Sequence, residues 1–196
     1  AANHVNNHEA YPEEKKAKYI VTSKSLNKKQ KMDMCAVCHS GNDKEKLKSL
    51  FYFRPGDTLS NFILQMPGNK KTTGFDVHGN QQSLLSESEC FIKSKKMDCS
   101  SCHKPHENAG NNLAVYSQKC MGCHTEAGNN FCTVKPAAGI SLKDNCIDCH
   151  MPKKPSAAIS FYQQGNTQLS SYLLRTHKIA VYKSDTLASI LNHDKK

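Results

Sequence analysis

Hydrophobic positions are sparse along this chain, and they form only short periodic runs. Residues 1–34 are polar and rich in lysine, and Ser-Leu-Asn at 25–27 predicts the start of a helix that runs into the first cysteine pair. A second helix is predicted over 81–93. Short apolar or alternating runs at 157–162 and 177–182 favour extended segments. The pattern therefore predicts a mainly α fold with much irregular loop.

Turn and stop signals divide the chain unevenly. A long gap precedes Cys99, and it holds turn signals at 54–57 and 66–69. Beyond Cys99 the cysteine pairs are crowded, and Pro105 and Pro152 are expected to end the helices that carry two of them.

The composition is short of core-forming residues. Hydrophobic residues make up 37% of the chain, aromatic residues 7%, and Trp is absent. We expect a single domain over 1–196, and this supply is thin for its apolar core. Ten cysteines suggest either an oxidising compartment or the use of cysteine for a cofactor. No run of about 18 apolar residues is present, so no transmembrane helix is predicted.

Four segments share the pattern Cys-x-x-Cys-His, at 35–39, 99–103, 120–124 and 146–150, and we name them sites one to four in that order. This is the attachment signature of c-type haem, in which two thiols bond to the porphyrin and the next histidine binds the iron. The predicted attachment residues are Cys35, Cys38, Cys99, Cys102, Cys120, Cys123, Cys146 and Cys149. The predicted iron ligands within the motifs are His39, His103, His124 and His150.

Two other uses of paired cysteines fit the pattern less well. A zinc ribbon uses two Cys-x-x-Cys pairs but does not need a histidine directly after each. A thioredoxin-like site needs one pair within a βαβ pattern, and no such pattern is visible. The sequence therefore predicts four covalently attached haem c groups, which would also fill an interior that the side chains leave open.

Each iron has a second axial position, and six histidines lie outside the motifs. His106 follows His103 by three residues, which span at most about 10 Å, so we expect it to serve a different haem. The predicted distal ligands are His4, His78, His106 and His177. His8 and His193 lie in polar surroundings and are expected to remain at the surface. Methionine is the competing ligand type, and the alternatives are Met66, Met121 and Met151.

Cys90 and Cys132 belong to no motif. Two leftover cysteines are an even number, and an exported protein is free to oxidise them. We therefore predict a Cys90–Cys132 disulfide, with two separate buried thiols as the alternative.

The formal net charge of +10 suggests anionic partners. Counting iron and ionised propionates, four haems would lower it to about +6 when oxidised and about +2 when reduced. Nucleic acid is therefore not an expected partner. Redox proteins with acidic docking surfaces are expected instead.

With these motifs placed, the chain resembles the multihaem c-type cytochromes, particularly those related to the cytochrome partners of hydroxylamine and nitrite metabolism. The shared segments are C-x-x-C-H-x-x-H at Cys99–His106, D-x-H-G at Asp76–Gly79, C-H-M-P at Cys149–Pro152 and T-H at Thr176–His177. The likeness extends loosely over 1–182. It implies a multihaem cytochrome c fold organised around stacked haems, in a periplasmic or extracellular protein. In such proteins a haem motif often precedes a distal histidine, so His4 could bind an iron outside these four sites, in a longer multihaem protein.

The expected function is electron transfer by four mostly bis-histidine haems rather than enzymatic catalysis. A multihaem redox enzyme acting on nitrite or hydroxylamine is one alternative, and it would need one iron with an open position. A subunit of a homo-oligomer or filament, forming a polymeric cytochrome wire, is the other.

Overall fold

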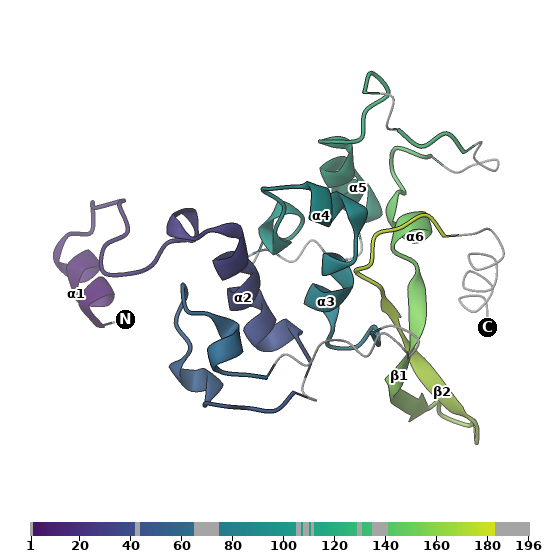
Figure 1. Ribbon diagram of the computed structural model, residues 1–196, viewed down its shortest axis with the longest axis horizontal. Coiled ribbons are helices and arrows are strands. Elements are labelled where there is room, and N and C mark those ends of the chain that lie inside the picture. The colour runs from purple at the N-terminus through teal and green to yellow at the C-terminus, as the bar shows by residue number, and fades with distance from the viewer. Residues whose placement is uncertain are drawn as a thin grey trace.

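The computed structural model is mostly helical, with long irregular connections and one small two-stranded hairpin (Figure 1). The structure describes residues 2–41, 44–64, 75–104, 107, 110, 112–128, 131–134 and 141–182. The helices are α1 (Ala2–Ala10), α2 (Lys28–His39), α3 (Gln81–Ser86), α4 (Glu89–Lys93), α5 (Leu113–Met121) and α6 (Ile147–His150). The strands are β1 (Lys153–Tyr162) and β2 (Leu169–Arg175). Short 3-10 turns are η1 (Ser23–Ser25), η2 (Leu50–Tyr52), η3 (Leu59–Asn61) and η4 (Cys99–Ser101). The predicted mainly α fold with much irregular loop is thus confirmed.

The helix predicted to run into the first cysteine pair is confirmed as α2. Its N-terminus is a capping box, because the Asn27 side chain accepts from the Gln30 amide at 2.9 Å and the Gln30 side chain accepts from the Asn27 amide at 3.0 Å. The helix ends at His39, the last residue of site one. The local capping box therefore defines where the helix that carries site one begins.

The helix predicted over 81–93 is divided into α3 and α4 at Glu87 and Ser88. The Ser88 amide donates to the Leu85 carbonyl at 3.0 Å, after which the backbone turns extended. The Ser88 side chain is fully buried and bonds to the backbone of residues 177 and 179. The Ser88 hydroxyl, at the break between α3 and α4, is thus satisfied by hydrogen bonds to a segment far away in the chain.

A cluster of buried apolar residues lies at site one. It joins Ala36 on α2 to Leu59, Phe62 and Ile63, and the Phe53 ring packs edge-on against Phe62 with centroids 5.4 Å apart. Most of the large apolar side chains on the hairpin are half-buried or exposed. Within the described ranges, no helix has the length and hydrophobicity needed to cross a membrane.

The hairpin returns the chain to site four. β1 and β2 are antiparallel, Lys153 pairs with Arg175, and an irregularity interrupts the register between Pro155 and Ser160. The extended segment predicted at 157–162 is confirmed within β1. The segment predicted as extended at 177–182 does not form a strand; it follows β2 as irregular chain whose backbone groups bond to several separate elements.

Asp76 fastens the long loop to the start of the hairpin. Its carboxylate accepts from the Ala157 amide at 2.6 Å, the Ser156 hydroxyl at 3.0 Å and the His78 amide at 2.7 Å. Burial alone would raise the pKa of Asp76, but these hydrogen bonds outweigh it and lower the pKa below its ordinary value. The charged carboxylate is therefore the form that holds this junction.

Replacing Asp76 by alanine is expected to lower the free energy of unfolding by about 2 kcal/mol, because three donors lose a charged acceptor. Guanidinium unfolding followed by far-ultraviolet circular dichroism measures this change. Asp57→Ala is the matched control, since the Asp57 carboxylate accepts from the Arg54 amide in an exposed turn. The control is expected to cost less than about 1 kcal/mol, and equal losses in the two variants would contradict an anchoring role for Asp76.

Candidate haem sites

Each Cys-x-x-Cys-His motif folds as a turn of helix at the end of, or just beyond, a helical element. Site one is the last turn of α2, and site two begins on η4. Site three starts at the end of α5, and site four coincides with α6. In sites two to four the histidine amide donates to the carbonyl of the first cysteine, at 2.9, 2.9 and 3.0 Å respectively. This turn brings the first cysteine and the histidine one above the other, as attachment to one haem edge and binding of its iron require.

The motif side chains are accessible to a large planar group. His39, His103 and His124 are exposed, and His150 is half-buried. The second cysteines Cys38, Cys123 and Cys149 are exposed, whereas Cys102 and the first cysteine of every motif are half-buried. The residues therefore fit covalent attachment of a porphyrin, whose apolar faces would cover them and enlarge the small core.

The His150 ring is oriented by a backbone carbonyl. Its Nδ1 lies 2.8 Å from the carbonyl oxygen of Ala180, and its own carbonyl accepts from the Ala180 amide at 3.2 Å. When Nδ1 carries the proton and donates to the carbonyl, Nε2 keeps its lone pair free for a metal. This backbone hydrogen bond is the usual outer-shell partner of an axial imidazole.

His103 of site two faces His177. Their ring centroids are 6.1 Å apart and the ring planes differ by 30°. With each imidazole–metal bond about 2 Å long, one metal ion between two imidazoles holds the ring centres roughly 6 Å apart. The structure thus brings a predicted motif ligand and a predicted distal ligand to the spacing of an axial pair.

The environment of His177 favours its neutral, metal-binding form. Burial, and then the neighbouring charge of His103, lowers the pKa of His177 to about 4. Its Nδ1 is buried and has no hydrogen-bond partner. Desolvation also lowers the pKa of His103, although that residue as a whole is exposed, and the charge of His39 adds to the effect.

Sites one and two lie against each other. The Lys31 ammonium on α2 is 3.3 Å from the Asp98 carboxylate that caps η4, and the Cys99 thiol lies 3.7 Å from the Met32 sulfur. The Cys35 and Cys99 thiols interact, which lowers the pKa of Cys35 and raises that of Cys99. The first attachment sulfurs of these two sites are therefore neighbours.

Sites three and four form a second neighbouring pair. The Cys146 amide donates to the buried Ser117 hydroxyl of α5 at 3.0 Å. Burial, and then the charge of the Cys146 thiol group, raises the pKa of Cys120 to about 11. The Tyr116 ring, one turn before Cys120, lies 5.6 Å from the His103 ring and so connects this pair with site two.

Of the other predicted distal histidines, His4 and His78 are not seen at the spacing of an axial pair in the described part of the chain. His78 is exposed and follows the Asp76 junction, while Gly79 has φ +75° and lies so close to Gly41 that an added Cβ would be 3.0 Å from its Cα. The loop that carries His78 therefore contacts the chain at Gly41, two residues after site one. His106 and Met66 lie outside the described residues.

His4 lies on α1, which Figure 1 places at one end of the molecule, away from the other helices. Its Nδ1 is 2.7 Å from the Lys18 carbonyl oxygen, and its ring contacts the His8 ring with centroids 4.7 Å apart. The structure thus does not bring His4 to any of the four motifs, and its role as a ligand stays a prediction.

The predicted Cys90–Cys132 disulfide is not formed in the structure, where both residues are free thiols. Cys90 instead lies near the attachment sulfurs of sites two and three: its charge contributes, after burial, to a raised pKa of Cys102, and burial raises its own pKa. Cys132 lies near Cys149 of site four, whose pKa is raised first by burial. The two thiols thus have different neighbouring sites.

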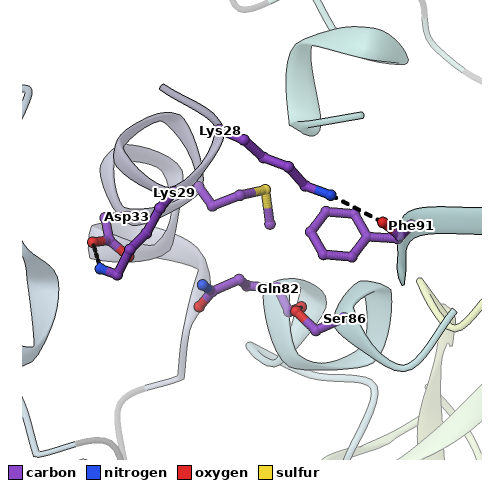
Figure 2. A pocket seen from close by; sticks show the side chains of 7 residues that line it. Lys28, Lys29, Asp33, Gln82, Ser86 and Phe91 are labelled. Carbon is purple, nitrogen blue, oxygen red and sulfur yellow. Dashed lines mark hydrogen bonds and ion pairs between the residues drawn. The ribbon is translucent and has the colours of Figure 1, made fainter. Parts of the chain in front are cut away.

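An open cavity of about 420 Å³ lies between α2 and the α3–α4 region (Figure 2). Its lining residues are Lys28, Lys29, Met32, Asp33, Gln82, Ser86 and Phe91. The Lys28 ammonium stands 3.7 Å above the centroid of the Phe91 ring and donates to the Phe91 carbonyl at 2.9 Å. Because Met32 touches Cys99, the cavity adjoins the attachment edge of site two. Sequence reasoning missed this cavity, since its walls come from segments far apart in the chain.

No family model matches the chain, and neither a curated protein nor a solved structure matches it. In the part of the chain that the structure describes, no group of three or more His, Cys, Asp or Glu side chains is placed to hold a metal ion by itself.

Proposed function

We propose that this protein is an electron-transfer cytochrome that carries four covalently bound haem c groups. The observation that carries the proposal is the fourfold Cys-x-x-Cys-His motif, folded each time as one helical turn. Haem bound there would supply reversible one-electron chemistry at its iron. The cysteines would attach the group, and His39, His103, His124 and His150 would each occupy one axial position.

Axial geometry supports a carrier over an enzyme. The spacing of His103 and His177 suits an iron with both axial positions filled, which leaves no room for a substrate. His150 is held by a backbone carbonyl, as expected for a strongly donating axial ligand. The remaining predicted distal ligands are His4, His78 and His106, of which the structure brings His4 to none of the four motifs.

Charge favours docking on acidic redox proteins in a periplasmic or extracellular setting. The chain carries 27 Lys and Arg against 17 Asp and Glu, and four haems would leave a positive net charge of about +6 when oxidised and about +2 when reduced, which steers association with anionic surfaces. Rates of electron exchange with such a partner should fall as salt is added, because the steering is screened.

The mass of the intact, exported protein tests the proposal. Four haems should remain attached under denaturing conditions, because thioether bonds are covalent. Cys90→Ser with Cys132→Ser is the matched control and should keep all four haems, whereas Cys120→Ser with Cys123→Ser should lose one. A mass without any porphyrin would refute the assignment.

A spectroscopic measurement separates carrier from enzyme. Paramagnetic resonance of the oxidised protein should give low-spin signals only, and the visible spectrum should not change on addition of nitrite or carbon monoxide. A high-spin signal that responds to these small molecules would favour the enzyme reading.

A subunit role in a polymeric cytochrome is the second candidate, and α1 is the observation that favours it. This helix buries none of its residues and carries His4 and His8 at one end of the molecule (Figure 1). Sedimentation at several concentrations distinguishes the two readings: a constant monomer mass supports the single carrier, and growth with concentration supports assembly.

A further inference from the structure

The five residues 176–180 connect two haem sites that are far apart in the chain. They leave β2 and pass α6 and the corner between α3 and α4, as the yellow segment of Figure 1 shows. Thr176 is almost completely buried, and its amide donates to the Pro152 carbonyl at 3.1 Å, just beyond site four. The segment therefore starts from a fixed point next to site four.

The middle of the segment is tied to the α3–α4 corner. The Ile179 amide donates to the Ser88 hydroxyl at 2.8 Å, and this hydroxyl lies 3.4 Å from the His177 carbonyl, to which it donates. The Lys178 ammonium pairs with the Glu87 carboxylate at 2.7 Å. Because Ser88 is fully buried, its hydroxyl has no water to replace these partners, and the bonds hold the backbone on both sides of His177.

The two ends of the segment act on different imidazoles. His177 faces His103 of site two at 6.1 Å between ring centroids. Three residues later, the Ala180 carbonyl lies 2.8 Å from Nδ1 of His150, the motif histidine of site four. A single backbone path thus sets the place of one axial imidazole and the ring orientation of another.

We propose that residues 176–180 form a positioning strap, which holds the axial imidazoles of sites two and four in register with each other. This inference rests on the proposed haem-binding function and adds to it a physical link between two sites. A shift of the strap moves the His177 ring relative to His103, and it also changes the hydrogen bond that fixes the His150 tautomer. Outer-shell hydrogen bonds of this kind tune ligand basicity and with it the reduction potential.

The strap determines which of the four sites respond together to a change. A change confined to the strap should alter sites two and four together and leave sites one and three as they were. A merely structural role would give a different outcome, since general loosening of the fold acts on all four sites or on none.

The test is Ser88→Ala in the haem-loaded protein, with Ser86→Ala as the matched control. The Ser86 hydroxyl is on the same helix corner but donates to the Gln82 carbonyl within α3. Paramagnetic resonance resolves low-spin haems by their g values, which depend on the angle between the two axial imidazole planes. We expect two of the four signals, with their reduction potentials, to shift in Ser88→Ala, and none in Ser86→Ala.

Ser88→Thr serves as the rescue variant, because it keeps the hydroxyl, and it should restore the two signals toward their original positions. A shift of a single signal, of all four, or of none in Ser88→Ala would overturn the strap. The haem count separates this result from the proposed function: four low-spin haems with unshifted signals refute only the strap, whereas missing haems refute the function itself.

A measurement on the unaltered protein keeps the proposal testable if Ser88→Ala does not fold. The Ile179 amide proton and the His150 Nδ1 proton should show the same protection factor, which is the exchange rate of the exposed group divided by the rate observed in the folded protein, because opening of the strap exposes both. Protection factors that differ by more than about tenfold would show independent opening and would overturn the proposal.

Discussion

Replacing His177 by alanine is expected to convert one of the four irons of the proposed haem-loaded protein from low spin to high spin, while the protein keeps the mass of the four haems that we propose. The reason is that His177 and His103 stand at the spacing of an axial pair, so truncation removes the imidazole from only one side of one iron. The porphyrin would still be attached by Cys99 and Cys102. The measurement is the high-spin fraction in the paramagnetic resonance spectrum of the oxidised protein.

His8→Ala is the matched control for this change, since His8 is a histidine of α1 that is not expected to bind an iron. It should leave all four irons low spin. The vacant position created in His177→Ala should also bind carbon monoxide after reduction, which the unaltered protein should not do. A His177→Ala protein with an unchanged spectrum would assign the distal ligand of site two to another residue.

Replacing Arg175 by alanine is expected to lower the free energy of unfolding by about 3 kcal/mol, the largest stability loss that we expect of a single side chain near the haem sites. The Arg175 guanidinium donates to the Met151 carbonyl at 2.9 Å, to the Ile147 carbonyl at 3.4 Å and to the Asp148 carboxylate at 2.8 Å. The guanidinium thus joins the Asp148 side chain of α6 to the Met151 carbonyl that follows the helix, and it also donates to the Ile147 carbonyl, which accepts from the Met151 amide at 2.8 Å as well. Guanidinium unfolding of the haem-loaded protein measures the loss.

Two further variants test whether the stability loss in Arg175→Ala comes from the several hydrogen bonds that the planar guanidinium makes at once. Arg175→Lys keeps the charge but cannot reach all three acceptors, so it should recover less than half of the lost stability. Lys178→Ala removes an exposed ion pair with Glu87 nearby and should cost less than about 1 kcal/mol. If Lys178→Ala cost as much as Arg175→Ala, the hydrogen bonds of the guanidinium would not be the cause.

Sequence reasoning located the motifs and the local structure that presents them. The helix before site one could be predicted because its start signal is local, and the structure adds that Asn27 and Gln30 cap each other across one turn. The hairpin strand over 157–162 could be predicted from short-range alternation. Both depend on interactions between residues that are close in the chain, which is the range that a sequence pattern reports.

The arrangement of the sites relative to one another could not be predicted in this way. In the sequence, Ser88 has the pattern of an ordinary helix residue. In the structure its hydroxyl accepts from the Ile179 amide, 91 residues further along the chain, and the predicted helix is interrupted at this point. The partners of 177–182 could not be predicted for the same reason, since two of its amides bond to the Ser88 hydroxyl and the His150 carbonyl instead of to a neighbouring strand. The facing of His103 and His177 also depends on the return path of the hairpin.

The Cys90–Cys132 disulfide illustrates a limit of counting cysteines. Two leftovers are an even number, but each lies among attachment sulfurs of different motifs, Cys90 near sites two and three and Cys132 near site four. Parity carries no information on distance, and a disulfide needs its two Cα atoms within about 7 Å.

The interaction of the Cys35 and Cys99 thiols has a consequence for how the protein matures. With its pKa lowered by the neighbouring Cys99 thiol, Cys35 forms its thiolate more readily than an ordinary cysteine, and a thiolate is the species that begins disulfide formation. If the chain carries the haems that we propose, a folded chain that met a thiol oxidant before their attachment would cross-link two attachment segments and close both to porphyrin. Haem ligation would then have to precede folding of this region, or a reductant would have to accompany the unligated chain until the thioethers are made.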